Sequence, residues 1–329
     1  GFAQIYDVKA ELSGAQLGSV EVVDRRNGVH YAMRTYKRAE LSKRKRAEMC
    51  ASIAAQRVLA DSPEAEDLRM ARLVSLHEVV QSPSSLMLMN DVVPRGGDDL
   101  LSMIERRGRL AEKNARQLFT KLVLATKRAH DRGVVLRAIK PETVQVQKDP
   151  VDGSLVVCFC DMRCATLVDR DDLEAGTLSG LHGTPEYSAP EEVIWYWHEL
   201  TPPSDEEARS AMYGAKVDIW SLGMCLHVML CGCFPFENSD DEDMLRAINA
   251  ADFSYSDPGW SKLSEDALDM VQMLLQRDPL DRPFLEEVLQ HPFCATTVSE
   301  TVQVEREASM KTMDMEAALA ALDVDDDES

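Results

Sequence analysis

The first ninety or so residues carry short β-type segments separated by turns. Residues rich in Val, Tyr, Met and Thr alternate with polar residues or cluster over 19–24, 29–36 and 85–93, which is typical of strands. Asn27 and Gly28 lie between the first two segments, and an Asn-Gly pair in that place indicates a tight hairpin turn. Between the second and third segments, the Ala- and Arg-rich residues 47–60 favour a helix. This part of the chain is predicted to be a small sheet with one main helix.

The rest of the chain shows the spacing of apolar residues that is typical of amphipathic helices. Helices are predicted over residues 111–133, 217–232, 264–278 and 284–293. Pro94, Gly96 and Gly97 interrupt both kinds of pattern and therefore indicate a hinge between the two parts. The second part is predicted to be mainly helical.

The predicted fold class is α+β, with two lobes and a tail. The expected parts are a β-rich N-lobe at residues 1–93, a larger helical C-lobe at 94–295 and a helical, acidic tail at 296–329. A Met-rich apolar stripe that starts at Met310 has two interpretations, packing on its own domain or binding a partner. The aspartates from Asp323 to Asp327 have the spacing that begins a calcium loop. The Gly and Glu that such a loop requires are missing, so a solvated acidic end is expected.

Composition is that of a folded protein without a membrane segment. The chain has 329 residues, of which 45% are apolar, and this length allows a sizeable core. It contains no run of about eighteen apolar residues and begins with no export signal, so we expect a cytoplasmic protein without membrane insertion. The eight cysteines include no C-x-x-C pair, which favours reduced thiols. Because the chain does not begin with Met, it is also a candidate fragment of a longer protein.

Charge is strongly acidic overall but unevenly distributed. A net charge of −21 argues against nucleic acid as a partner, because binding to phosphate backbones depends on Lys and Arg. Residues 37–46 form a basic block, and residues 237–244 and 323–329 form acidic blocks. These blocks have two interpretations. They are a solvated helix face and solvated acidic loops, or the basic block docks an acidic partner or the chain's own tail.

Seven short motifs follow one another along the chain. They are LSGAQLGSV (12–20), YAMR (31–34), VVLRAIKPETVQV (134–146), FCDMRCA (159–165), GTPEYSAPEE (183–192), VDIWSLG (217–223) and QRDPLDRP (276–283). In order and spacing they resemble the protein kinases, in particular the calcium/calmodulin-dependent branch, over about residues 6–293. The resemblance implies the two-lobed kinase fold and a centre that positions ATP and magnesium for phosphoryl transfer.

The phosphate-facing parts of such a centre depart from the family pattern. In the Gly-rich turn, Ser13 and Ala15 stand where the first two glycines are expected, and only Gly18 remains. The lysine of the third strand corresponds to Arg34, whose planar guanidinium is not equivalent to a compact ammonium group. ATP and magnesium binding is therefore expected to be weak or absent, and no cofactor is predicted.

The catalytic side chains implied by the resemblance are also altered. The helix glutamate that holds the strand lysine corresponds to Ala55, or to Gln56 in a register shifted by one. The proton-accepting aspartate is replaced by Ala138 and the metal-binding asparagine by Thr143, although Lys140 between them is retained.

The metal-binding Asp-Phe-Gly motif of the family corresponds to Asp161, Met162 and Arg163. Asp161 is the one retained metal ligand. A cationic Arg163 in place of glycine restricts the backbone and competes with magnesium for the carboxylate, so an ion pair between Asp161 and a nearby arginine is expected. Gly18, Lys140 and Asp161 are thus interpreted as vestiges of a cofactor site.

Four residues match family positions that maintain the structure. Arg137 and Asp218 correspond to residues that tie the catalytic loop to the central helix of the large lobe. Glu191 and Arg282 correspond to a buried ion pair that fastens the activation segment. Breaking a buried pair costs about 3–5 kcal/mol, so these four anchors are expected to serve the fold whether or not chemistry occurs.

Two departures from the family pattern are candidates for function. Asn90 stands at what resembles the gatekeeper position, followed by a hinge segment that is one residue longer than the family pattern. After Glu191 comes an insertion with Trp195, Tyr196 and Trp197. Clustered aromatic residues are enriched at protein interfaces, although these rings equally fit a role in covering their own lobe.

The sequence therefore resembles a pseudokinase, which keeps the kinase architecture without its catalytic groups. We expect no enzyme activity and a role as scaffold or allosteric regulator that binds protein partners, including an active kinase or a larger assembly. Two alternatives remain open. One is a nucleotide-binding switch without turnover. The other is an atypical transferase in which Arg34, Lys140 and Asp161 hold a nucleotide in a different pose.

Overall fold

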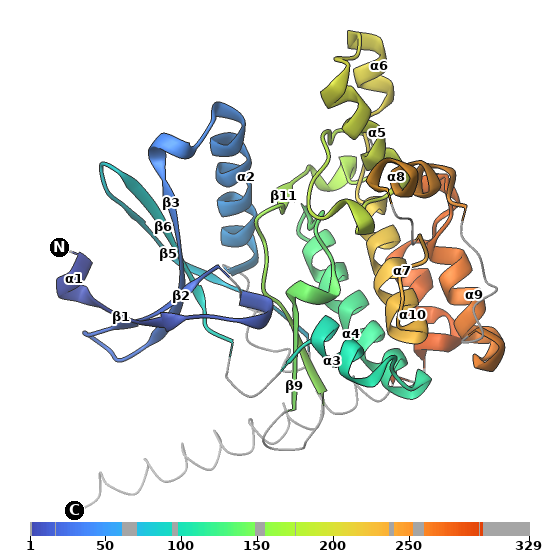
Figure 1. The fold of residues 1–329 in the computed structure, drawn as a ribbon, viewed down its shortest axis with the longest axis horizontal. Helices are drawn as coiled ribbons and strands as arrows, with labels where there is room; N and C mark the ends of the chain where they lie inside the picture. The colour runs from blue at the N-terminus through green and yellow to red at the C-terminus, as the bar shows by residue number, and fades with distance from the viewer. Residues whose placement is uncertain are drawn as a thin grey trace, which may run out of the picture.

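The computed structural model describes residues 2–16, 18–60, 71–93, 98–148, 155–174, 176–236, 240–252, 260–295 and 297–298. Figure 1 shows a β-rich part formed by the N-terminal residues beside a larger helical part. The tail from residue 299 onward, with its Met-rich stripe and acidic end, lies outside the described residues. Residues 94–97 of the expected hinge also lie outside them.

The N-terminal part is a five-stranded antiparallel sheet in the order β1-β2-β3-β6-β5. Its strands are β1 (Tyr6–Glu11), β2 (Val20–Asp24), β3 (His30–Lys37), β5 (Leu76–Gln81) and β6 (Ser85–Asp91), with a short helix α1 (Phe2–Ile5) before them. The turn from β2 to β3 has Gly28 at a φ of 75°, and the amide of Val29 donates to the Asn27 side chain at 2.9 Å. The predicted hairpin is therefore confirmed. The edge strands β1 and β5 are largely exposed, which explains their weaker apolar pattern.

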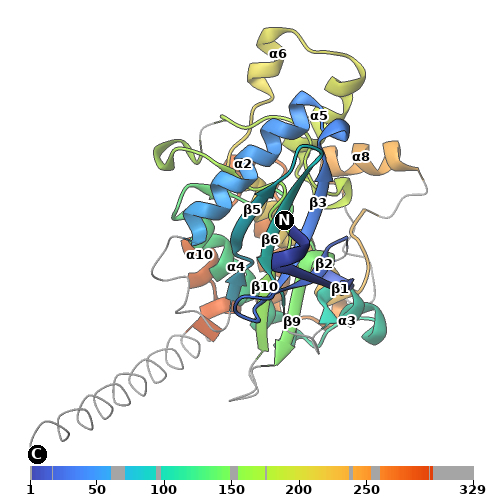
Figure 2. The same ribbon diagram turned by 90° about the vertical axis from the view of Figure 1, so that its left-hand side faces the viewer.

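Helix α2 (Lys43–Ala60) packs against β5 (Figure 2) and against β11 of the C-terminal part (Figure 1). Its buried residues, Ser52, Ala55 and Gln56, lie on one helical stripe. The helix begins inside the basic block, where Arg44 pairs with Glu48 at 2.9 Å and with Glu199 of the C-terminal part at 2.6 Å. Part of the basic block thus contacts an acidic residue of the same chain.

The C-terminal part is mainly helical. Its helices are α3 (Leu100–Arg107), α4 (Glu112–His130), α5 (Pro190–Leu200), α6 (Asp205–Ser210), α7 (Lys216–Cys231), α8 (Asp241–Ala250), α9 (Glu265–Leu274) and α10 (Leu285–Gln290). The four predicted helices are confirmed as α4, α7, α9 and α10, whereas α3, α5, α6 and α8 were not predicted. No helix in the described ranges is both long enough and apolar enough to cross a membrane.

Short strands connect the two parts and frame the loops between them. A four-stranded sheet has the order β4-β10-β9-β7, and β8 pairs with β11. These strands are β4 (Ala71–Leu73), β7 (Asp98–Asp99), β8 (Val134–Val135), β9 (Val144–Lys148), β10 (Leu155–Phe159) and β11 (Thr166–Leu167). Because β4 runs parallel to β10, a segment from before the expected hinge completes a sheet of the later part.

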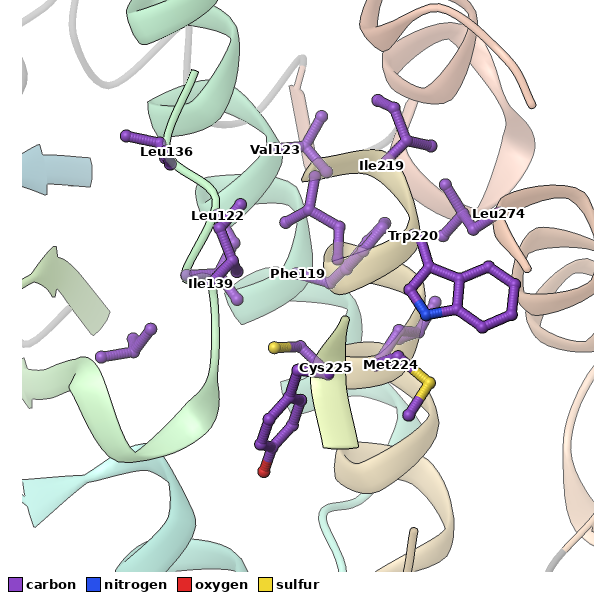
Figure 3. Close-up of a cluster of buried hydrophobic side chains, with 14 of the residues drawn as sticks. Phe119, Leu122, Val123, Leu136, Ile139, Ile219, Trp220, Met224, Cys225 and Leu274 are labelled. Carbon is purple, nitrogen blue, oxygen red and sulfur yellow. The ribbon is translucent and has the colours of Figure 1, made fainter. Parts of the chain in front are cut away.

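The main core lies between α4, α7 and α9. Figure 3 shows Phe119 of α4, Trp220 and Met224 of α7 and Leu274 of α9 gathered there, and all four are fully buried. Burial of one such side chain stabilises a fold by about 1.5–3 kcal/mol. Ile139, from the loop after β8, is 1% exposed and packs into the same cluster. The loop that carries several candidate site residues is therefore fixed to the core.

One of the two interpretations made the first acidic block a solvated loop. Residues 241–243 are exposed, but residues 241–244 are helical, so the loop is wrong. Asp240 caps α8, because its side chain accepts hydrogen bonds from the amides of Glu242 and Asp243 at 2.8 and 3.3 Å. Acidic side chains also stabilise the first turn of a helix through its dipole. Residues 237–239 of the block lie outside the described residues.

Candidate functional site

The loop after β8 is held by the carboxylate of Asp218, near the start of α7. Asp218 is fully buried and accepts hydrogen bonds at 2.8 Å from the amides of Leu136 and Arg137, and His130 Nε2 lies 2.8 Å from it. Arg137 has a φ of 57°, in the left-handed region that is unfavourable for a residue with a side chain. Its Nε also donates to the carbonyl of Cys164 at 2.9 Å. The buried carboxylate thus holds a strained backbone in place.

The polar side chains farther along this loop bond to the protein itself. Lys140 Nζ donates to Thr184 Oγ1 at 2.6 Å, and Thr143 Oγ1 donates to the carbonyl of Lys140 at 3.1 Å. Ala138 lies close to Gly183, where a Cβ would stand 3.3 Å from the Ala138 methyl group. The position that the resemblance assigns to the proton acceptor therefore carries a methyl group beside backbone.

The carboxylate of Asp161, which follows β10, is bonded to Arg163. Arg163 Nε lies 2.8 and 2.9 Å from the two carboxylate oxygens, and the Arg163 amide donates to Oδ1 at 3.0 Å. The Asp161 side chain is 11% exposed and that of Arg163 is 53% exposed. Met162 between them is buried in the main core. Both oxygens of the retained acidic group thus face a cation of the same turn.

Electrostatics keep this carboxylate ionised. Burial by itself would raise the pKa of Asp161, but the hydrogen bonds and charge of Arg163, with the charge of Arg34, outweigh burial and lower the pKa. The hydrogen bond to Asp161 raises the pKa of Arg163 in turn. The pair is therefore charged on both sides at neutral pH.

These residues do not fit a magnesium ion. Magnesium requires oxygen ligands, commonly one or two carboxylates together with phosphates and water. The Asp161 oxygens are bonded to Arg163, and the Thr143 hydroxyl is bonded to backbone. In the described ranges, no group of three or more His, Cys, Asp or Glu side chains could hold a metal ion.

Arg34 of β3 lies beneath the turn between β1 and β2. Its Nε donates to Ser19 Oγ at 3.3 Å. A Cβ built on Gly18 would stand 3.6 Å from Nη2 of Arg34, and Gly18 has a φ of 81°. The retained glycine of this turn therefore lies directly over the guanidinium group.

The two α2 residues considered for the position of the helix glutamate are both buried. Ala55 is fully buried in the main core, and Gln56 bonds to Ser52 at 3.0 Å and accepts from Asn90 Nδ2 at 2.7 Å. Ser52, one turn before Gln56, donates to the carbonyl of Met162 at 2.7 Å. Ser52 is thus a side chain of α2 that reaches the Asp161–Arg163 turn, and it was not predicted from the sequence. A small polar residue four positions before Gln56, on the same helix face, was the available signal.

The second pair of anchors forms a bidentate ion pair. Nη1 and Nη2 of Arg282 each lie 2.7 Å from an oxygen of Glu191. The Arg282 side chain has no exposed surface, and it also donates to the carbonyls of Gln276 at 2.8 Å and Lys216 at 2.9 Å. Such charge-assisted, paired hydrogen bonds are geometrically specific. The pair joins the start of α5 to the segment before α10.

The aromatic cluster of the insertion lies on α5. Trp195, Tyr196 and Trp197 are half-buried and pack against the main core of their own lobe. Trp195 Nε1 donates to the carbonyl of Ala211 at 2.9 Å. At the end of the same helix, Leu200 is 64% exposed. The three rings therefore stabilise the position of α5 and α6, and Leu200 is the apolar side chain presented outward.

A surface pocket of about 320 Å³ lies between α4, α7 and the residues before α10. Charged groups of both signs line it, including Lys127, Lys216 and Glu286. None of the candidate site residues contributes to this pocket. It is therefore separate from the groups around Asp161.

Comparison with known proteins gives one family match and several relatives. A family model described as protein kinase domain matches residues 6–294. Calcium/calmodulin-dependent protein kinase type 1B of Rattus norvegicus is 32% identical over 220 residues, which are 67% of this chain and 57% of that protein. The ovarian-specific serine/threonine-protein kinase Lok of Drosophila melanogaster is 30% identical over 286 residues, 87% of this chain and 56% of that protein.

A third relative has a much longer chain. Serine/threonine-protein kinase DCLK3 of Mus musculus is 31% identical over 230 residues, 69% of this chain and 26% of that protein. The chain thus spans between 26% and 57% of the length of these three relatives. The family match extends over both the sheet with α2 and the helical part.

Proposed function

We propose that this chain, which belongs to the protein kinase family and has the α+β fold expected from its sequence, is a pseudokinase. In this proposal it transfers no phosphoryl group and acts through protein partners, as a scaffold or an allosteric regulator. An active kinase and a larger assembly are the partner classes considered. The chain spans only 26% to 57% of the lengths of the three relatives, so the activities in their names do not establish an activity for this chain.

The observation that carries the proposal is the ion pair between Asp161 and Arg163. Phosphoryl transfer depends on metal ions that bridge the phosphates and neutralise developing charge. Asp161 is the retained side chain at a metal-binding position, and both of its oxygens are bonded to Arg163. A magnesium ion would have to displace a guanidinium group that the same carboxylate holds at short distance.

The loop after β8 supports the same conclusion. A positioned general base contributes about 10²- to 10⁴-fold to a reaction rate. Ala138 has no group that accepts a proton, and Lys140 is bonded to Thr184. The acid–base group and the metal site are altered together, and the loss of either group from a catalytic unit already removes most of its rate. We therefore expect phosphoryl transfer to be negligible.

The proposal is tested by incubating the chain with magnesium ATP and a generic serine- and threonine-containing peptide. We expect no radiolabelled phosphate on the peptide or on the chain itself. The matched control is Asp161→Asn, which removes the carboxylate charge and little volume. A signal that persists in this variant comes from a contaminating kinase. A wild-type signal that disappears in the variant contradicts the proposal, because Asp161 would then serve in catalysis.

Two further measurements test the alternative functions, the atypical transferase and the nucleotide-binding switch. Lys140 and Asp161 bond to Thr184 and Arg163 respectively, so a nucleotide held by either group would have to displace a partner within the protein. Mass spectrometry of the chain after incubation with ATP detects transfer of a group other than phosphate, as the atypical transferase requires. Thermal stabilisation by nucleotide without any product favours the switch, since a ligand that binds only the folded state raises stability.

For partner binding we propose the outer face of α5 and α6. Leu200 is 64% exposed, and Ser204 begins α6 with three acidic residues in its first turn. Because Trp195 to Trp197 pack on the core, a partner would contact Leu200 and the acidic turn rather than the rings themselves. Leu200→Glu is expected to reduce cross-linking to a partner and to leave the thermal unfolding temperature unchanged, since the side chain is outside the core.

A further inference from the structure

The side chain of Gln16 bonds to the segment that links the two lobes. Gln16 ends a short 3₁₀ turn, η1 (Gly14–Gln16), between β1 and β2, and is 7% exposed. Its Nε2 donates to the carbonyl of Asp91 at 2.7 Å. The amide of Val93 donates to its Oε1 at 3.0 Å. Both hydrogen-bonding atoms of one side-chain amide are therefore used by backbone groups two residues apart.

The paired backbone groups form a recognition edge. A carbonyl and an amide two residues apart on an extended chain point to the same side, and together they fit a planar group with a donor beside an acceptor. A glutamine side chain has that arrangement. Adenine also has it, because its amino group is a donor adjacent to a ring nitrogen that accepts. The edge formed by Asp91 and Val93 thus suits either occupant.

The turn that carries Gln16 lies down against the C-terminal part. In Figure 1 the dark-blue turn between β1 and β2 reaches β9, and η1 also contacts β7 and the turn at Pro141–Thr143. Ala15 is 6% exposed. A Cβ built on Gly14 would stand 3.4 Å from Oδ2 of Asp99, the residue that caps α3. Little space remains between this turn and the helical lobe.

We infer that Gln16 is an internal occupant of an adenine-type site at the hinge. The side chain satisfies the carbonyl of Asp91 and the amide of Val93 in the absence of ligand, and a purine reaches them only after Gln16 has moved away. Arg34 lies beneath Gly18, farther along the same connection between β1 and β2. The inference deepens the proposed function and rests on it, since it explains how a pseudokinase excludes nucleotide from the edge formed by Asp91 and Val93.

The test measures adenosine binding to the full chain by calorimetry. Adenosine presents the adenine edge without phosphates, so neither magnesium nor Asp161 is involved. Gln16→Ala removes the internal occupant, and the affinity for adenosine is expected to rise at least about tenfold. The reason is that the wild type must first break two hydrogen bonds, which reduces the fraction of molecules competent to bind.

Two further variants keep the test valid if the alanine variant folds poorly. Gln16→Met keeps the length and apolar contacts of the side chain but has neither donor nor acceptor. Gln16→Glu places a carboxylate oxygen against the carbonyl of Asp91, and this repulsion is expected to expel the side chain. The control is Gln81→Ala, an exposed glutamine bonded to Arg38 at 2.9 Å, which should change neither folding nor adenosine affinity.

Hydrogen exchange of the Val93 amide reports the contact directly. In the wild type this amide should exchange slowly, because it donates to Gln16 in a buried turn. In the three Gln16 variants it should exchange faster, and added adenosine should slow it again. Equal exchange in the wild type and in Gln16→Met would show that Gln16 does not occupy the hinge.

The measured affinities for adenosine decide whether the inference holds. Adenosine binding that is equally tight in wild type and variants overturns the inference, because Gln16 would then not compete. A freed Val93 amide without adenosine binding in any variant also overturns it, because the edge would then not be an adenine site. Phosphate transfer by the wild type would contradict the proposed function alone, since adenosine has no phosphate to transfer. The two failures are therefore distinguishable.

Discussion

Two arginine–carboxylate pairs in this protein have similar bond lengths and opposite settings. Arg282 and Glu191 are far apart in sequence, and the Arg282 side chain has no exposed surface. Arg163 and Asp161 are two residues apart, and the Arg163 side chain is 53% exposed. The first pair joins α5 to the segment before α10. The second pair neutralises the carboxylate of a single turn, the one that follows β10.

The comparison shows that an ion pair serves the fold only where other groups depend on it. Arg282 also donates to the carbonyls of Gln276 and Lys216, so its removal breaks these two hydrogen bonds as well as the ion pair. Arg163 has no comparable set of backbone acceptors among the contacts of its turn, and its guanidinium faces solvent in part. In the first pair the charges hold elements together. In the second they occupy the carboxylate that the family uses for metal.

The largest expected effect is on the buried pair. Arg282→Met should lower the free energy of unfolding by about 3–5 kcal/mol, because Glu191 would remain as an uncompensated, mostly buried charge. Urea unfolding measures this difference. The double variant with Glu191→Gln should recover part of the loss, since no buried charge remains. A cost below about 1 kcal/mol for the single variant would contradict the role given to this pair.

A smaller effect is expected at Asp218. Asp218→Asn replaces one carboxylate oxygen by a donor, which then faces the amide of Leu136 or Arg137. We expect a loss of about 2 kcal/mol in the free energy of unfolding, typical of a hydrogen bond to a charged group. Asp131→Asn, at an exposed pair with Lys127, is the control and should cost under about 1 kcal/mol. Equal losses of stability in the two variants would contradict the role of Asp218 in holding the loop after β8.

The smallest effect is expected at the pair formed by Asp161 and Arg163. Arg163→Ala should cost about 1 kcal/mol at pH 7, because half of the Arg163 side chain is exposed and the positive charge of Arg34 still acts on Asp161 in the variant. Urea unfolding at a series of pH values checks this cost and its pH dependence.

The sign of the pH dependence follows from Asp161. Its pKa in the folded protein lies below the usual value, so its contribution to stability is present above about pH 4 and is lost as pH falls through the lowered pKa. The difference between wild type and Arg163→Ala should therefore be full at pH 7 and shrink toward pH 3. A difference that grows on acidification would mean that Arg163 stabilises something other than the Asp161 carboxylate.

The sequence was sufficient for those parts of the fold that depend on local patterns. The Asn27–Gly28 hairpin and helices α4, α7, α9 and α10 follow from turn chemistry and apolar spacing. Helix α8 was missed because its acidic first turn resembles a solvated loop, although acids are favourable at a helix start. Edge strand β1 was missed because few of its side chains are buried.

In the candidate site, too, features formed within one short motif were predicted, and features that depend on tertiary packing were not. The identities of Ala138, Thr143 and Arg163 are readable from ordered motifs, because each motif is short and continuous in sequence. The pairing of Asp161 with Arg163 is also local, since two residues of one turn form it. The contact of Ser52 with the Asp161–Arg163 turn was not predicted, because it depends on how α2 is rotated against its neighbours.

By itself, the sequence determined the family resemblance, the two kinds of lobe and the loss of particular functional groups. Only the tertiary structure decided that Ser52 reaches the carbonyl of Met162 and that Gln16 bonds to Asp91 and Val93. The physical reason is that a hydrogen bond requires its two atoms to lie within about 3 Å. Residues 75 positions apart, as Gln16 and Asp91 are, meet that condition only after the sheet, the helix and the linking segment have packed together.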